Sequence, residues 1–164
     1  MHQIYKGEWE RALKVCPRCS YHFRLTAQER LAITVDEGSL QAFQDKLPPA
    51  DPLRFPEYVD KLQTHRSRTG LEDALLTGTA TIEGHPLVLG ISDSHFMMGS
   101  AGAVFGELFV RMIEHAVELR LPVVIISGSG GGMRMQEGLV ALMQMAKMTA
   151  AIEQLHQARL LYVV

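Results

Sequence analysis

The sequence has little of what marks several common classes of protein. It has only two cysteines among 164 residues, Cys16 and Cys19, and one close pair cannot form a disulfide framework. Basic and acidic residues nearly balance, 16 against 18, so the net charge of −2 offers no basic excess for binding nucleic acid. The opening segment MHQIYKGEWERALK is polar and interrupted by charges, which is unlike a signal peptide.

Long apolar runs are also missing. The best candidate for a membrane-spanning helix is interrupted by charged residues, namely Glu107, Arg111, Glu114 and Glu118. Such a stretch is not apolar enough to cross a bilayer. We therefore expect a cytoplasmic protein with no membrane association.

What the sequence contains indicates one core domain with a small appendage. Hydrophobic residues make up 47% of the chain, which is enough for a sizeable core. Residues 1–25 form a small polar unit around the two cysteines. Residues 26–70 are expected to be a helical and proline-rich connector, and residues 71–164 carry an α/β pattern.

The connector has clear start and stop signals. Thr26 and Glu29 have the spacing of a capping box, which predicts a helix from Thr26 to near Gly38. Residues 47–56 contain four prolines and are expected to form a linker or wrapping loop. A plausible exposed helix follows over 57–68 and is closed by Gly70.

The last part of the chain alternates strands and helices. Residues 75–82 and 87–91 flank the turn 83–86, which predicts a hairpin. Apolar residues recur at helical spacing over 104–117. Residues 123–126 form an uninterrupted β-branched run, as expected for a strand covered on both faces.

A second helix is expected over about 134–157. Between Gly138 and Ile152 its only charge is Lys147, so it is expected to be buried on several sides. One chain would not supply that much cover, and we therefore expect a partner surface here. Residues 160–164 read as the start of another buried strand.

The candidate functional centre is the glycine-rich turn SGSGGGMRMQE, residues 127–137, between a strand and a helix. The first N–H groups of a helix have no intrahelical partner, and the helix dipole favours an anion there. Glycine lets a ligand approach the backbone closely. Two such N–H groups aimed at one point would stabilise an enolate or a tetrahedral oxyanion. Composition alone leaves a purely structural turn as an equal alternative.

A phosphate-binding loop fits this turn less well. That loop needs the pattern G-x-x-x-x-G-K-[ST], but Met133 and Arg134 stand where the lysine and hydroxyl residue should follow. The spacing G-x-G-x-x-G of dinucleotide-binding turns is not matched either.

Several segments together resemble one known family. The run SGSGGGMRMQEGLVALMQMAK, residues 127–147, resembles the S-x-S-G-G-A-R-M-Q-E-x-x-x-x-L-M-Q-M-A-K signature of the carboxyltransferase β subunit of bacterial and plastid acetyl-CoA carboxylase. FMMGSAG, residues 96–102, resembles that family's F-M-G-G-S-M-G segment. VCPRC at 15–19 and TAQERL at 26–31 resemble the second half of its amino-terminal zinc ribbon and the helix after it. The likeness covers essentially the whole chain in the same order.

The resemblance implies a fold and a reaction. The fold is α/β and crotonase-like, with ββα units that spiral into a layered core, here the amino-terminal part of that domain over 71–164. Half a zinc ribbon would precede it in residues 1–25. The reaction, part of fatty acid biosynthesis, moves a carboxyl group from carboxybiotin on its carrier protein to acetyl-CoA and gives malonyl-CoA. No side chain is required as a nucleophile, so the protein positions its substrates and stabilises an oxyanion.

The resemblance also implies site residues. The N–H donors to the thioester oxygen would come from the turn, with Gly130 and Gly131 as first candidates and Gly132 beside them. The acyl-CoA site would be lined by the segment 96–102, with the candidates Phe96, Gly99, Ser100 and Gly102. Arg134 would contact the CoA phosphates or hold the turn, and a structural ion pair is an equally physical alternative.

Metal and partners follow from the same resemblance. Cys16 and Cys19 would be ligands of a structural zinc, although the family uses two Cys-x-x-Cys pairs and only this pair is present. The expected partners are the carboxyltransferase α subunit in an α2β2 heterotetramer, the biotin carboxyl carrier protein and biotin carboxylase. His22 could be a third zinc ligand or a surface histidine, and the cysteines could instead be a redox pair.

The sequence departs from the family in length and inside the turn. The chain lacks the first cysteine pair and stops in the strand that should lead to a second glycine-rich turn, so we expect a fragment or a second chain that supplies the rest. Between Ser129 and Arg134 there is one residue more than in the family. The extra residue rotates the N–H directions, which leaves open which two glycines serve.

Other functions share parts of this pattern. A propionyl-CoA carboxyltransferase or a malonate decarboxylase subunit would share the glycine turn but usually lacks the zinc ribbon. An inactive fragment could act only as an assembly module through its apolar helix. His95, in the loop before Phe96, could be a general base, although the family chemistry does not need one.

Overall fold

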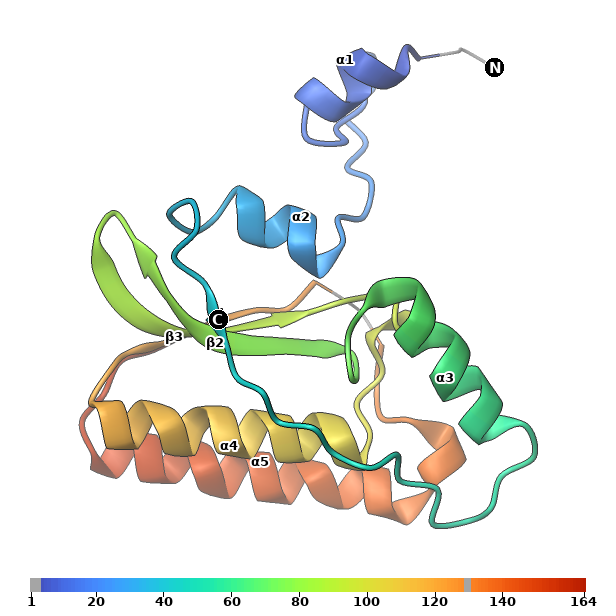
Figure 1. Ribbon diagram of the computed structural model, residues 1–164, viewed down its shortest axis with the longest axis vertical. Helices are drawn as coiled ribbons and strands as arrows, with labels where there is room; N and C mark the ends of the chain where they lie inside the picture. The colour runs from blue at the N-terminus through green and yellow to red at the C-terminus, as the bar shows by residue number, and fades with distance from the viewer. Residues whose placement is uncertain (1–3, 129–130) are drawn as a thin grey trace.

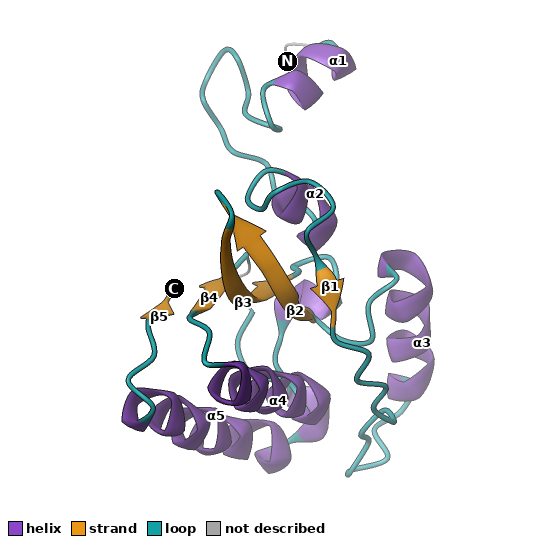
Figure 2. Ribbon diagram, turned by 60° about the vertical axis from the view of Figure 1, so that its left-hand side comes forward, coloured by secondary structure: helices purple, strands orange, loops and turns teal. Residues whose placement is uncertain are grey.

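The protein is described here by a computed structural model over residues 4–128 and 131–164. Within these residues the strands form one sheet in the order β1-β2-β3-β4-β5 (Figures 1 and 2). The strands are β1 (Gln41–Ala42), β2 (Leu75–Ile82), β3 (His85–Ser92), β4 (Val123–Ile126) and β5 (Tyr162–Val163). The first three pair antiparallel, whereas β3, β4 and β5 run parallel.

The β2–β3 hairpin is closed by a tight turn. Glu83 and Gly84 both have positive φ, 51° and 78°, and such turns match the twist of paired strands. The Asp36 carboxylate accepts hydrogen bonds from the N–H groups of both turn residues, at 3.0 and 2.8 Å. The predicted hairpin is therefore confirmed, and a residue of the connector fixes its turn.

Two long helices cover one face of the sheet. The helices α4 (Ala103–Leu119) and α5 (Leu139–Gln157) lie side by side, and each joins two parallel strands (Figures 1 and 2). Their apolar residues pack against β2, β3 and β4 in one core cluster. Its buried members are Leu75, Val88, Val104, Leu108, Phe109, Met112, Ile113, Ala116, Val123, Ile125, Ala151 and Leu155.

The connector covers the opposite face and one end of the sheet. It contributes α2 (Ala27–Ala32) and α3 (Tyr58–Thr69), which begin with the buried residues Ala27 and Tyr58. The second core cluster consists of Ala27, Tyr58, Leu62, Leu71, Ala74, Ala80, Leu87, Leu89, Ile91 and Phe96. The central strand β3 thus packs against helices on both faces.

The amino-terminal unit stands apart from the sheet. Its helix α1 (Lys6–Arg11) lies beyond α2 (Figure 1), and no residue of α1 belongs to either core cluster. Within the described residues, no helix is both long and apolar enough to cross a membrane.

Several predicted elements differ in extent. The capping box of Thr26 and Glu29 is present, but α2 ends at Ala32 instead of near Gly38. The chain turns away because Asp36 is committed to the hairpin. The helix closed by Gly70 is confirmed, with Gly70 at φ 70°, although its Tyr58 and Leu62 are buried. The expectation of an exposed helix is wrong for that face.

The last helix begins later than predicted. Arg134 is still extended, a short 3-10 turn covers Met135–Glu137, and Gly138 at φ 56° separates it from α5. Within this chain α5 buries only one side, with Ala141, Gln144, Ala151 and Leu155. Much of its apolar surface is exposed, so the expected burial on several sides is not found within the described residues, and cover by a partner stays a prediction.

Candidate active site

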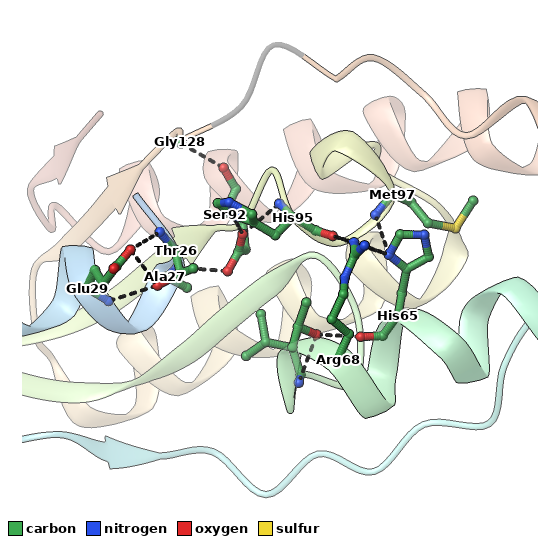
Figure 3. Close-up of polar contacts among 12 residues, drawn as sticks. Thr26, Ala27, Glu29, His65, Arg68, Ser92, His95, Met97 and Gly128 are labelled. Carbon is green, nitrogen blue, oxygen red and sulfur yellow. Dashed lines mark hydrogen bonds and ion pairs between the residues drawn. The ribbon is translucent and has the colours of Figure 1, made fainter. Parts of the chain in front are cut away.

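The glycine-rich turn leaves the carboxyl end of β4 and starts beside β3. The Gly128 N–H donates to Ser92 Oγ over 2.8 Å, which fixes the start of the turn to the end of β3 (Figure 3). Ser129 and Gly130 lie outside the described residues, so the structure does not place the expected donor Gly130.

The far end of the turn pairs with the segment 97–101. The Ala101 N–H donates to the Gly132 carbonyl over 2.9 Å, and the Arg134 N–H donates to the Ala101 carbonyl over 2.8 Å. These two bonds form a parallel bridge between Ala101 and Met133. The two segments that the sequence singled out are therefore brought together.

Gly131 lies against the backbone of the same segment. A Cβ atom at Gly131 would lie 2.7 Å from Ser100 N and 2.8 Å from the Gly99 carbonyl carbon, and still closer to the Met98 carbonyl oxygen. No other residue type fits without a shift of the backbone. At Gly132, by contrast, a Cβ atom would meet nothing within 4 Å.

The turn keeps unpaired donors beside a pocket. The N–H groups of Gly131, Gly132 and Met133 have no acceptor among the described residues. A pocket of about 410 Å³ opens at this place, and its lining comes from α3, the segment 97–100 and the turn. The lining residues are His65, Met97, Met98, Ser100, Gly131, Gly132, Met133, Arg134, Met135 and Gln136. Backbone donors next to such a pocket suit a ligand oxygen that carries negative charge.

Arg134 is buried in an ion pair. Its side chain is fully buried, and two of its nitrogens donate to the two carboxylate oxygens of Asp73 over 2.8 and 2.7 Å. It also donates to the Ser100 carbonyl over 2.6 Å. Burial alone would lower the pKa of the guanidinium, but Asp73 outweighs it and raises the pKa. Arg134 thus stays charged and ties the turn to the pocket wall, whereas a contact with CoA phosphates stays a prediction.

Glu137 completes this buried cluster. Its carboxylate accepts from the Tyr58 hydroxyl and from the Ala103 N–H, each over 2.5 Å, and lies 3.5 Å from the Arg134 guanidinium. Ala103 begins α4, so the positive end of that helix faces the carboxylate. Burial raises the pKa of the Tyr58 hydroxyl, and the hydrogen bond to Glu137 raises it further. The hydroxyl therefore stays protonated and acts as a donor.

The other residues expected in the acyl-CoA site have different positions. Phe96 is fully buried in the second core cluster, and Gly99 and Gly102 are also buried. A Cβ atom at Gly102 would collide with the Glu137 carboxylate, which explains the glycine there. Of the four candidates only Ser100 lines the pocket. Their contact with substrate stays a prediction.

The loop that carries these residues is fixed at its start by Asp93. This buried carboxylate accepts from the Ala27 N–H over 2.8 Å and from the His95 N–H over 2.7 Å (Figure 3). The His95 ring lies against the same carboxylate, with Nδ1 2.9 Å from it, and does not line the pocket. This geometry gives no support for His95 as a general base.

His65 lines the pocket although the sequence analysis did not single it out. Its Nδ1 accepts from the Met97 N–H over 3.4 Å, and an Arg68 nitrogen and the His95 carbonyl oxygen lie 2.9 and 3.2 Å from the same atom (Figure 3). Burial lowers the pKa of its imidazole, and the charge of Arg68 lowers it further. The sequence did not indicate a role for His65, which is a single histidine in a helix that was expected to be exposed. Only the packing of α3 against the segment 97–100 brings it to the pocket.

The amino-terminal cysteines lie in a small turn. Val15 and His22 pair across it, and Cys16 is buried whereas Cys19 and His22 are exposed. A structural zinc ion typically takes four ligands. No group of three or more suitable side chains occurs in residues 4–128 and 131–164, so the residues described do not by themselves fit a zinc site.

Comparison with known proteins now decides the family. The model of the carboxyl transferase domain matches residues 22–164, which include the turn, the 96–102 segment and the Arg134 cluster. This chain belongs to the carboxyl transferase domain family. The expectation from the glycine turn and its flanking signature is confirmed at this level.

Individual relatives agree with that assignment. The acetyl-coenzyme A carboxylase carboxyl transferase subunit beta of Desulforamulus reducens is 51% identical over 160 residues. The match covers 98% of this chain but 55% of that protein, so the chain spans about half the length of this relative.

Solved structures of carboxyl transferases share the fold. Transcarboxylase 12S with hydrolysed methylmalonyl-coenzyme A bound has a TM-score of 0.66 and 28% identity, over 81% of this chain and 24% of that chain. A Pseudomonas malonate decarboxylase hetero-dimer has a TM-score of 0.58 and 23% identity, over 82% of this chain and 49% of that one, and shows the fold alone. The expected α/β carboxyltransferase fold is thus confirmed, while the zinc ribbon is not.

Proposed function

We propose that this chain is the acyl-CoA-binding part of an acetyl-CoA carboxylase carboxyltransferase, which moves a carboxyl group from carboxybiotin to acetyl-CoA. One observation carries the proposal. The unpaired N–H groups of Gly131, Gly132 and Met133 stand beside a pocket of about 410 Å³ in a chain of the carboxyl transferase family. The identity with the β subunit of Desulforamulus reducens favours acetyl-CoA among acyl-CoA substrates.

The residues of the turn would act on the thioester oxygen. Removal of the α-proton places negative charge on that oxygen, and backbone N–H groups held in a fixed turn stabilise it without reorganisation. One such donor is typically worth about 3 kcal/mol of transition-state stabilisation. Gly130, Gly131 and Gly132 are the proposed source of these donors, and Ser100 and Arg134 would line the pocket beside them.

Carboxybiotin, delivered on its carrier protein, would supply the carboxyl group. The transfer forms a bond between the α-carbon and the carboxyl carbon, breaks the bond from that carbon to the biotin nitrogen, and moves the α-proton to the departing biotin. The described chain then needs no nucleophilic side chain. Its contribution is to position the thioester and to stabilise its oxygen.

The exposed side of α5 is the proposed contact with a partner subunit. The side chains of Leu139, Leu142 and Met143 are 71%, 52% and 57% exposed, and Met135 beside them is 85% exposed. Such a contiguous apolar surface usually marks an interface. It adjoins the turn through a second pocket lined by Met133, Arg134, Met135, Gly138, Leu139 and Leu142. The α subunit of an α2β2 assembly is the partner that would complete the biotin side, with biotin carboxyl carrier protein and biotin carboxylase acting before it.

A structural zinc ion could bind here only if residues outside the described part of the chain supplied further ligands. Cys16 and Cys19 would contribute two thiolates, and the remaining ligands would have to come from another segment or chain. The pair has no assigned role in carboxyl transfer.

The test is a carboxyl-transfer assay with the chain, its partner subunit and carboxybiotin carrier. We expect malonyl-CoA from acetyl-CoA, with a clearly lower kcat/KM for propionyl-CoA. A preference for propionyl-CoA would instead favour the second candidate, a propionyl-CoA carboxyltransferase, which the fold shared with transcarboxylase 12S makes reasonable. No acyl-CoA binding by the assembled complex would favour an assembly module, and measurable binding would argue against one.

A further inference from the structure

The pocket contains one side chain whose role the proposed function does not use. His65 projects from α3 into its wall, together with Met97, Met98 and the turn residues Gly131 and Gly132. The ring lies in a tilted stack on Phe96, with centroids 5.5 Å apart, so its orientation is fixed by packing.

The hydrogen bonds of the ring determine its tautomer. Both the Met97 N–H and the Arg68 guanidinium donate to Nδ1, and an accepting nitrogen carries no proton. The His95 carbonyl oxygen lies 3.2 Å from the same nitrogen. This oxygen already accepts a hydrogen bond from Arg68, which also contacts Nδ1. The proton of neutral His65 therefore resides on Nε2.

Burial, followed by the positive charges around the ring, disfavours its protonation. Arg68 lies on the same helix, Arg134 faces it from the turn, and the neighbouring loop presents the His95 backbone. No carboxylate among the described residues bonds to the ring. A third positive charge is disfavoured in this position, and a proton on Nδ1 would also break the two bonds that this nitrogen accepts.

The Nε2–H group is left without a partner. No acceptor bonds to it among the described residues, and the edge of the ring that carries it faces away from Arg68 and the Met97 N–H (Figure 3). The side chains of the adjacent pocket residues Met97 and Met98 provide no strong acceptor. A neutral N–H donor in such a wall suits a ligand oxygen with a lone pair and little or no full charge.

We propose that neutral His65 is a binding residue of this pocket, whose Nε2–H donates a hydrogen bond to a carbonyl oxygen of the bound acyl-CoA. The inference rests on the proposed function, because it takes the pocket as the acyl-CoA site. The carbonyl is either that of the thioester or an amide of the pantetheine arm, which have the same hydrogen-bonding chemistry.

The matched variants separate the two ring nitrogens. H65N keeps an acceptor near the position of Nδ1 and removes the Nε2 donor, whereas H65Q extends an amide N–H toward the position of Nε2. The control is H156N, the same histidine-to-asparagine change at an exposed position near the end of α5. Calorimetry on the assembled subunits measures the affinity for CoA and for an unreactive acetyl-CoA ketone analogue.

We expect H65N to bind the analogue about tenfold more weakly than the wild type, the cost of about one hydrogen bond. H65Q should recover part of this loss, and H156N should bind as the wild type does. A loss with the analogue alone identifies the thioester carbonyl, and an equal loss with CoA identifies the pantetheine amide. Nitrogen chemical shifts of the ring should show the Nε2–H tautomer before ligand is added.

Three results would overturn the inference in different ways. If the wild type binds the analogue and H65N binds it equally well, His65 is not a binding residue and the proposed function stands. If the wild type binds neither ligand, the acyl-CoA assignment of the pocket fails, and the role of His65 fails with it. A ring with the proton on Nδ1 would also contradict the role.

Discussion

At the scale of single residues, the site depends on groups that never reach the ligand. Asp73 is buried and pairs with both ends of the Arg134 guanidinium. Breaking a buried pair by removing one partner leaves an uncompensated charge and typically costs about 3–5 kcal/mol. Arg134 in turn holds the Ser100 carbonyl, so the loss would spread to the pocket wall.

The D73N variant tests this. It keeps the shape of the side chain and removes its charge, and we expect the free energy of unfolding in urea to fall by about 3 kcal/mol. The neighbouring E72Q is the control, because Glu72 is 45% exposed and lies 3.5 Å from Arg66 at the surface. That change should cost about 0.5 kcal/mol or less. Equal effects of the two variants would show that Arg134 is not held by Asp73.

Gly131 and Gly132 give a second matched pair. A methyl group at Gly131 would meet the backbone of Met98 and Ser100, whereas one at Gly132 meets open space. We expect G131A to lower the free energy of unfolding by about 1–3 kcal/mol, as overpacking generally does. G132A should stay within about 0.5 kcal/mol of the wild type. Thermal unfolding of both variants measures the difference, and a stable G131A would mean that the turn does not pack on this segment.

The sequence identified some of these residues and missed others for a physical reason. The signature around Arg134 and the segment 96–102 are contiguous in the chain, so a local pattern could reveal them. Asp73, Tyr58 and His65 reach the site only through tertiary packing. Each lies in the connector or just after it, and no local spacing relates them to a turn more than 60 residues away.

At the scale of elements, prediction succeeded where a signal was local. The capping box, the hairpin and the left-handed Gly70 all depend on residues within a few positions of each other. The start of α5 was placed too early, because an apolar pattern cannot show the break that Gly138 introduces. The two-residue strand β1 was missed because it has no pattern of its own and exists only by pairing with β2.

The contact between α4 and α5 has an ionic part that depends on pH. Glu107 of α4 bonds to Lys147 of α5 and to Arg111 one turn further along α4. Hydrogen bonds from Lys147 and then Arg111 lower the pKa of the Glu107 carboxyl. A lowered pKa in the folded state means that its contribution to stability is present above the unfolded value, about 4.3, and is lost as the pH falls through the folded value.

The E107Q variant measures this contribution. At pH 7 we expect the free energy of unfolding of E107Q to be about 0.5–1 kcal/mol lower than that of the wild type. The effect is small because the ion pair is partly exposed. The two curves of stability against pH should converge once the pH falls below the lowered pKa of the folded state. E114Q on the same helix is the control, since its carboxylate has no ionic partner among the residues described. A difference between E107Q and the wild type that does not shrink as the pH falls from 7 into the acid range would contradict the ionic origin.

At the scale of the whole molecule, one surface is left incomplete. Three of the four buried residues of α5 are small or polar, namely Ala141, Gln144 and Ala151. Larger apolar residues of the same helix are exposed. An apolar helix of this kind is stable in water only when something covers it. The surface borders the glycine turn, so whatever covers it also closes one side of the pocket.

The L142K variant tests whether a partner subunit covers this surface. Leu142 is 52% exposed, so a lysine there should change the stability of the chain by only about 0.5 kcal/mol. At a buried interface, the same charge would be desolvated without a partner, and we expect at least a tenfold loss in affinity for the partner subunit. Leu119 at the end of α4 has nearly the same exposure, 51%, and L119K is therefore the control.

Sedimentation velocity of the mixed subunits should show assembly with L119K and free chains with L142K. Because the closed pocket needs the partner, carboxyl transfer should fall in parallel with assembly, and an L142K chain that assembles as L119K does would place the partner elsewhere.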